Sequence, residues 1–200
     1  MASLFPASVD TFSTPTAGSA TSSPSHATLH VNVNNAITNA QTYMGMTLVS
    51  TTTIGSGVSS VTVSSAFSTT YDNYKIILSG GTTNTTDATL SLRLGSTATG
   101  YYYGGMFAKY DGTSSNFAAV SNQTFFDIGY ASTNALSGKG ELDSPFLAKR
   151  TVLRSISTGT STTYFMNNYA GFLNDSTSYT AFTITASSGT MTGGTIPVYG

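Results

Sequence analysis

The segment Ala88-Thr-Leu90-Ser-Leu92-Arg-Leu94 decides the fold class of this chain. Its leucines alternate with polar residues, and neighbouring side chains of an extended chain point to opposite faces. One face of the segment is therefore apolar and the other is polar. This pattern predicts a β-strand that is buried on one side only.

Strand-like segments at short, regular spacing lie on both sides of it. They cover residues 58–63, 73–79, 100–109, 123–130, 138–143, 150–157, 163–173, 179–186 and 190–199. Turn signals such as Ser79-Gly-Gly and Asp111-Gly112 separate them. About ten short strands predict a mainly β domain over residues 46–200, an antiparallel β-sandwich of jelly-roll-like topology. Pro197 cannot donate a ladder hydrogen bond, so the last strand should lie at an edge or be locally broken.

The composition excludes several classes of partner and site. Only 8% of the residues are charged, against about 25% in a typical soluble domain, and the net charge is −1. Without a basic patch, nucleic acid is not an expected partner. No run of residues approaches the ~18 apolar residues of a membrane span. Cysteine is absent, which excludes disulfides and thiolate metal sites, and we expect no cofactor.

Residues 1–23 are low in complexity and read as an extended arm without a core of its own. Phe5 and Phe12 are its large aromatic residues. Asp10 is the only charged side chain before Asp72. One interpretation is a partly disordered terminus; the other is an arm whose two phenylalanines dock into a partner protein.

Residues 24–45 are predicted to form one short helix. Ser23 supplies an N-cap hydroxyl before Pro24, and Gly45 suits a helix end. Spacings of four and three define a heptad seam that consists of His26, His30, Val33, Ile37, Ala40 and Met44. The helix contains several asparagines and β-branched residues, so it needs packing partners to be stable. It packs either on its own β domain or on copies of itself around a trimer axis, and we favour the trimer.

Few residues carry the patterns of catalytic chemistry. His26 and His30 have a spacing that can chelate a metal, although interface hydrogen bonds explain them more simply. No histidine follows His30, which excludes His-assisted serine chemistry in the β domain. Lys139, Glu141 and Asp143 should share one strand face, where a surface ion-pair cluster is favoured over acid–base catalysis or a cation site. We therefore predict no enzyme and no catalytic residue.

Two aromatic clusters are candidates for sugar contact. Tyr101, Tyr102 and Tyr103 precede two glycines, and residues 164–169 form a second cluster. Aromatic residues on strands also serve as core or intersubunit packing, because they bury large areas. The basic residues Lys149, Arg150 and Arg154 favour a surface or intersubunit salt bridge.

Several blocks rich in Ser, Thr and Gly follow one another along the chain. They are Phe5-Pro-Ala-Ser-Val-Asp10-Thr-Phe12, Ser23-Pro-Ser-His26, His30-Val-Asn-Val-Asn34-Asn-Ala-Ile37, Ile54-Gly-Ser-Gly-Val-Ser-Ser-Val-Thr-Val63, Phe67-Ser-Thr-Thr-Tyr-Asp-Asn-Tyr-Lys-Ile-Ile77, Leu94-Gly-Ser-Thr-Ala-Thr-Gly-Tyr-Tyr102 and Gly189-Thr-Met-Thr-Gly-Gly-Thr-Ile196. In this order they resemble phage tail-fibre and minor virion structural proteins, including those of cyanophages.

This resemblance implies a component of the phage particle, usually a trimeric fibre or a decoration protein. The first hypothesis is a homotrimeric tail fibre or spike that is attached through its N-terminus to tail, baseplate or capsid proteins and contacts host surface carbohydrate. The alternative is a capsid decoration, cement or head-fibre protein.

Overall fold

The computed structural model describes residues 31, 33–35, 37–38, 45–113, 115–160 and 164–200, and the chain divides after Met46. Within the predicted helix, residues 31, 33–35 and 37–38 are helical. Val33 and Ile37 are 55% and 40% exposed, so both offer apolar surface. The other predicted seam and docking residues, His26, His30, Ala40, Met44, Phe5 and Phe12, lie outside the described residues. The helical seam and the arm therefore remain predictions.

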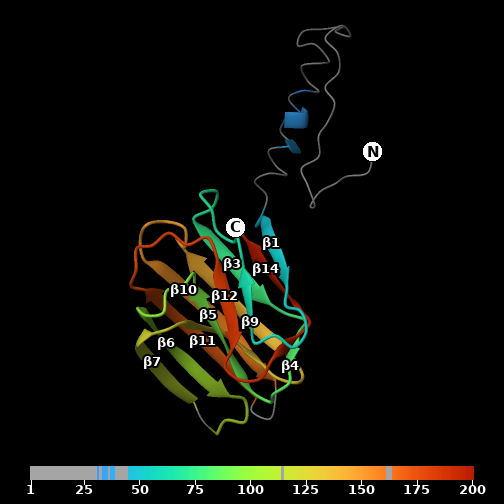
Figure 1. The fold of residues 1–200 in the computed structure, drawn as a ribbon, viewed down its shortest axis with the longest axis vertical. Helices are drawn as coiled ribbons and strands as arrows, with labels where there is room; N and C mark the ends of the chain where they lie inside the picture. The colour runs from blue at the N-terminus through green and yellow to red at the C-terminus, as the bar shows by residue number, and fades with distance from the viewer. Residues whose placement is uncertain (1–30, 32, 36, 39–44, 114, 161–163) are drawn as a thin grey trace. The chain divides into compact units, whose positions relative to one another are not determined.

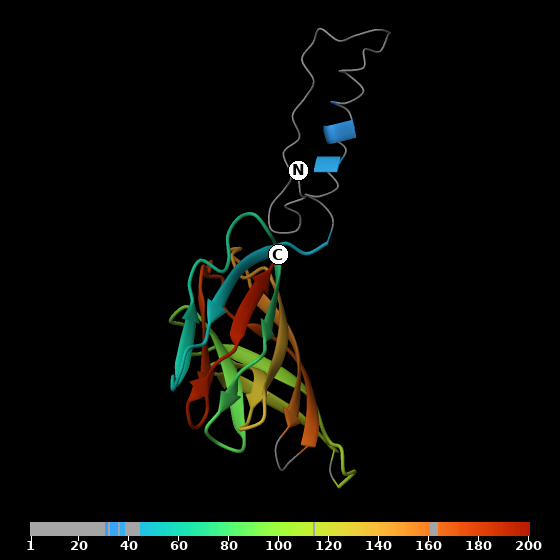
Figure 2. The ribbon, with the colours of Figure 1, turned by 90° about the vertical axis from the view of Figure 1, so that its right-hand side faces the viewer.

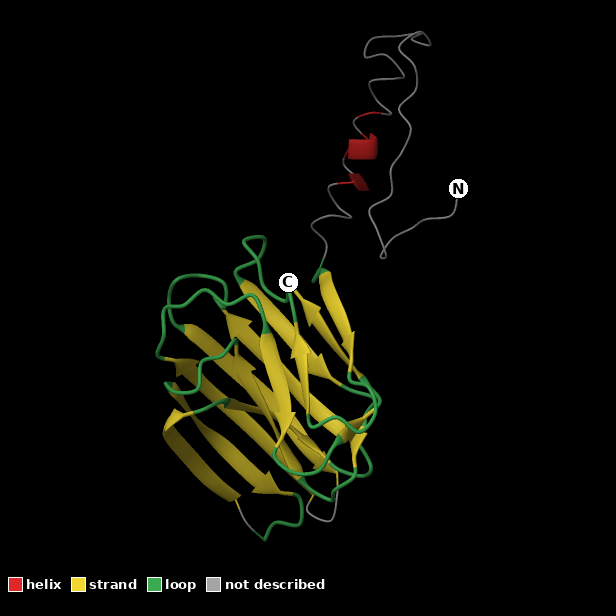
Figure 3. Cartoon of the chain, in the orientation of Figure 1, coloured by secondary structure: helices red, strands yellow, loops and turns green. Residues whose placement is uncertain are grey.

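From Thr47 to Gly200 the described chain is built of antiparallel strands (Figure 3), which confirms the predicted mainly β fold. The strands are β1 (Leu48–Thr53), β2 (Ser60–Val63), β3 (Asn73–Leu78), β4 (Thr82–Thr83), β5 (Ala88–Leu94), β6 (Tyr101–Lys109), β7 (Ser115–Gln123), β8 (Phe126–Ala131), β9 (Leu136–Asp143), β10 (Thr151–Thr160), β11 (Tyr164–Leu173), β12 (Phe182–Ala186), β13 (Met191–Thr192) and β14 (Thr195–Tyr199). Strands β4 and β13 form a small ribbon, and the others belong to one sheet.

The large sheet folds over on itself into two layers (Figures 1 and 2). The small layer has the order β2-β12-β5-β8. The large layer has the order β1-β14-β3-β9-β10-β11-β6-β7. The chain passes back and forth between the layers, with β2, β5, β8 and β12 on one side and the intervening strands mostly on the other. This alternation is of the jelly-roll type, with hairpin β10–β11 inserted between β9 and β6.

The two layers join where β8 meets β9. Strand β9 pairs with β8 at its start and with β10 over residues 139–143. Gly129 and Gly138 face each other at this junction. A Cβ on Gly138 would lie 2.8 Å from the Ile128 carbonyl oxygen and 3.0 Å from the Gly129 Cα. The two strands approach this closely because neither glycine has a side chain.

One apolar core lies between the layers. Leu90, Leu92 and Leu94 of β5 are fully buried in it, as their alternation predicts. Phe182 of β12 stacks on Phe67 at 5.6 Å between ring centroids. The polar residues of β5 point to the outer side of the small layer, where they become part of the groove described below.

Several stretches differ from the sequence-based expectation: β1 and all but the last residue of β7 were not predicted as strands, and two predicted strands are divided. The predicted strand 123–130 consists of the last residue of β7 and most of β8, with a turn between Gln123 and Phe126. The predicted strand 190–199 is divided into β13 and β14. Strand β14 is not at an edge, because it pairs with both β1 and β3, but its pairing with β3 skips Ile196 and Pro197. The proline breaks the ladder locally because it has no N–H to donate.

Candidate functional site

The three consecutive tyrosines of β6 have three different environments. Tyr101 is 0% exposed and packs edge-on against Phe126, with 4.8 Å between centroids. Its hydroxyl accepts a hydrogen bond from the Leu94 N–H (2.9 Å) and donates to the Thr97 carbonyl (3.1 Å). Burial raises the pKa of Tyr101 to about 12. The expectation that Tyr101 contacts a glycan is therefore wrong, because its side chain is enclosed by the core.

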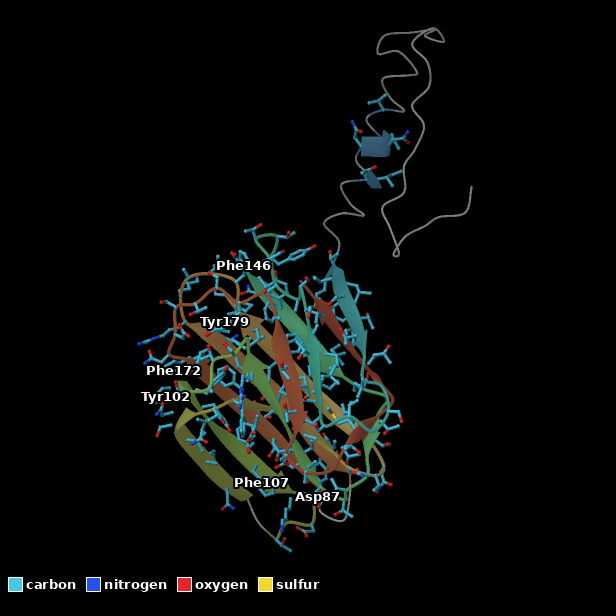
Figure 4. The ribbon with its side chains drawn as sticks, viewed as in Figure 1. Asp87, Tyr102, Phe107, Phe146, Phe172 and Tyr179 are labelled. Atoms are coloured by element: carbon cyan, nitrogen blue, oxygen red, sulfur yellow. The ribbon has the colours of Figure 1, made fainter. Side chains whose placement is uncertain are left out.

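Tyr102 points to the opposite face of β6. Its ring stacks on Phe172 of β11 with 5.3 Å between centroids and 11° between planes (Figure 4). The guanidinium of Arg150 lies 5.3 Å from the Phe172 ring centroid, within the range of a cation–π contact. Arg150, from the predicted basic cluster, thus covers an aromatic pair on the outer face of the large layer.

Tyr103 lies on the same side of β6 as Tyr101 but beyond the edge of the core. Its ring contacts Phe126 and Tyr169, at 6.1 Å and 5.8 Å between centroids. Its hydroxyl is hydrogen-bonded to the Asp127 carboxylate, and burial raises its pKa strongly. Gly171 stands opposite Tyr103 on β11, and a Cβ there would collide with the Tyr102 carbonyl oxygen and with the Cα and Cβ of Tyr103. The missing side chain of Gly171 therefore lets β11 approach β6 closely at Tyr103.

Tyr103 forms part of the wall of a groove of about 820 Å³ on the outer side of the small layer. Strands β5 and β12, which Figure 1 shows side by side in the sheet, carry its floor. The wall comes from β6, the end of β7 and the turn into β8, which supply Tyr103, Gln123 and Phe125. The floor residues are mostly hydroxyl-bearing: Thr89, Ser91, Ser96, Thr183, Thr185 and Ser187, together with Arg93.

The strand register arranges the floor in rows. Thr185 of β12 pairs with Ser91 of β5, and Ser91 pairs with Asp127 of β8. The next row pairs Thr183 with Arg93, whose Nε donates to the Thr124 carbonyl at 3.1 Å. Directly paired residues share a face, so three strands bring their oxygen-bearing side chains to one surface.

Asp127 is the titratable group set deepest in this groove. Burial raises the pKa of its carboxyl, and the hydrogen bond from Tyr103 partly opposes that rise. Its backbone carbonyl also accepts a hydrogen bond from the Ser155 hydroxyl of the other layer, at 3.0 Å. The carboxyl is thus held in place from the wall and through its own backbone.

The predicted face-sharing of Lys139, Glu141 and Asp143 is consistent with the alternating burial of β9. Glu141 pairs with Lys75 at 3.7 Å and Asp143 with Arg154 at 2.7 Å. Lys75 also lowers the pKa of Lys139 through a hydrogen bond and like-charge repulsion. Each carboxylate has its own cation, which favours the ion-pair interpretation over acid–base catalysis.

The outer face of the large layer carries an uncovered apolar row. Ile156 of β10, Asn168 of β11, Met106 of β6 and Phe117 of β7 face one another across four strands. Phe117 is 88% exposed and Ile156 is 50% exposed. Phe172 lies on the same face and is also exposed.

The second predicted aromatic cluster is divided between the two faces of β11. Asn167 is buried and bonded to Ser157, Asn168 belongs to the outer apolar row, and Tyr169 supports Tyr103. The side chains of Tyr164 and Phe165 lie outside the description. Sequence reasoning found Tyr103 but missed Asp127 and Arg93, which no local motif connects to it.

No protein-family model, curated protein or solved structure matches this chain. Within the described residues, no group of three or more His, Cys, Asp or Glu side chains is gathered as a metal site would require. The described helical residues form no segment long and apolar enough to cross a membrane.

Proposed function

We propose that this chain is a structural protein of a bacteriophage virion, a homotrimeric tail fibre or spike that is attached through its N-terminus and contacts host surface glycans. The observation that carries the trimer is the uncovered apolar row on the large layer. Phe117 and Met106 are paired across neighbouring strands and expose apolar surface side by side, and Ile156 is exposed in the same row beyond Asn168. Contiguous exposed apolar surface marks an interaction site.

The edge of the same sheet supports assembly with further copies. Strand β7 is the last strand of the large layer, and its other edge has no ladder partner among the described strands. Its sequence, SNFAAVSNQ, contains no charged residue and no proline. Monomeric proteins usually protect such edges with charges, prolines or bulges. Of these, β7 has one register irregularity, near its C-terminal end between Val120 and Gln123, and the rest of its edge is left regular. A second copy of the chain is the occupant that a closed ring of identical subunits would provide.

The outer face formed by β10, β11, β6 and β7 is smaller than a standard subunit interface. Four strands span about 14 Å and ten residues about 33 Å, which gives roughly 450 Å². A standard interface buries about 800 Å² per partner. The face alone is therefore too small for a stable contact. The predicted helical seam, with Val33 and Ile37 exposed, is the natural source of the remaining area.

Mass photometry of the full-length chain tests the assembly. We expect a trimer for the wild type and a shift toward monomer for Phe117→Ser at nanomolar concentration, with Tyr110→Ser as an exposed aromatic control in the neighbouring turn. A monomeric wild type would contradict the trimer. Antibody labelling of intact particles tests the location: a tail signal supports the fibre, a head signal supports capsid decoration, and no signal removes the virion role.

A further inference from the structure

The groove on the small layer combines features that recognise one class of ligand. Its floor is a grid of hydroxyls about 4.8 Å apart across the strands and about 7 Å apart along them. Tyr103 and Phe125 add aromatic surface at the wall. A ligand that fits both must present hydroxyl groups on one side and an apolar face on the other.

The charged residues of the groove exclude further classes of ligand. Among the described residues that line the groove, Arg93 and Asp127 are the only ones of a charged type, so their formal charges cancel. A phosphate or sulfate ligand would meet one cation and one carboxylate, which is a poor anion site. An aliphatic ligand would bury the hydroxyl floor without hydrogen bonds, at a cost for each group. A neutral polyhydroxylated ring has neither difficulty.

We propose that this groove is a binding site for a neutral oligosaccharide, with Asp127 as the main hydrogen-bond acceptor for ligand hydroxyls. This proposal assigns the glycan contact of the proposed function to a specific groove, and it therefore rests on that proposed function. Tyr103 holds the carboxylate through its hydroxyl and offers its ring to the sugar. From Thr89 to Arg93 the floor extends about 13 Å, which is longer than one sugar ring.

Two opposing effects act on the carboxyl of Asp127. Burial favours the neutral acid, whereas the Tyr103 hydrogen bond favours the carboxylate. A bound sugar would add further donors to the carboxylate. Hydrogen bonds to a charged group contribute more than neutral ones. Removing the charge while keeping the shape is therefore the sharpest change to test.

The experiment uses the full-length chain on an array of immobilised oligosaccharides of glucose, galactose, mannose and N-acetylglucosamine, beside sialylated and sulfated glycans. Calorimetry then measures the affinity for whichever neutral oligosaccharide is retained. We expect Asp127→Asn to weaken binding about tenfold or more, and Tyr103→Phe to weaken it less, since the ring remains. Asp111→Asn, in the exposed turn after β6, is the matched acid control and should bind as the wild type does.

Arg93→Gln provides a second variant at an exposed position if Asp127→Asn does not fold, and it should also weaken binding. Retention of no neutral oligosaccharide, preference for acidic glycans, or equal affinity of the groove variants and Asp111→Asn would each overturn the site. These results are independent of the particle labelling. If the chain binds sugar but is not found in the particle, the proposed binding site is supported and the proposed virion role is contradicted.

Discussion

Replacing Tyr101 by Phe tests the assignment of the three tyrosines. The ring stays against Phe126, so the change removes only the hydroxyl. The Leu94 N–H then loses its acceptor inside the core, and the Thr97 carbonyl loses its donor. A buried polar group left without its partner costs about 1–3 kcal/mol. Because Thr97 is partly exposed, we expect a total loss of about 2–4 kcal/mol.

For a domain of this size, that loss lowers the Tm by roughly 6–12 °C. Thermal unfolding followed by circular dichroism measures it, with Tyr102→Phe as the control. Tyr102 lies on the outer face and contributes its ring to a stack, so losing its hydroxyl should cost less than about 0.5 kcal/mol. Equal losses in the two variants, or no loss at Tyr101, would show that the assignment of Tyr101 to the core is wrong.

The same variant makes a prediction about alkaline pH. In the folded protein the pKa of Tyr101 is raised to about 12, whereas an unfolded tyrosine titrates near pH 10. The stabilisation that Tyr101 contributes is therefore complete below pH 10 and is lost as the pH rises through 12. Two pKa units correspond to about 3 kcal/mol. Tyr101→Phe should lose less stability than the wild type between pH 10 and 12, and parallel urea midpoints across that range would contradict this.

Two further changes test the glycines that allow close approach. Gly138→Ala should destabilise the junction of the layers by about 1–3 kcal/mol, because its Cβ would collide with the backbone of β8; an unchanged midpoint in urea unfolding would count against the junction. Gly171→Ala should force β11 away from β6, because its Cβ would collide with the β6 backbone at Tyr102 and Tyr103. Tyr103 would then shift in the groove wall and oligosaccharide binding in calorimetry should weaken, whereas full affinity in a folded Gly171→Ala protein would show that the position of Tyr103 does not matter.

The sequence predicts those elements whose two faces differ. The leucines of β5 alternate with polar residues, and the structure buries them as expected. Strand β7 was missed because Phe117, Ala118 and Ala119 are all exposed, so burial imposed no alternation on its sequence. A strand whose two faces both lack cover carries little pattern that periodicity can detect.

The groove escaped prediction for a different reason. Asp127, Tyr103 and Arg93 come from three strands and meet only through the register of the sheet. That register shifts by one residue at Leu90/Ser91, and Asp127 faces Ser91 only after this irregularity. Bulges of this kind redirect side chains without a clear signal in a single sequence. The run Tyr101–Tyr103 indicated a candidate sugar contact near the groove, but the sequence did not show that Tyr103 is the tyrosine that lines it.

The two proposals use different layers of the β domain and meet at β6, on opposite faces of that strand. On β6, Tyr103 points toward the groove, whereas Met106 belongs to the outer row that continues to Phe117. Subunits that associate through the outer row would therefore leave the groove open. Three grooves on one trimer would raise the avidity for a repeating surface polysaccharide without any new contact. Loss of the trimer in Phe117→Ser should accordingly weaken binding to a dense glycan surface while leaving the affinity of a single groove for a soluble oligosaccharide unchanged.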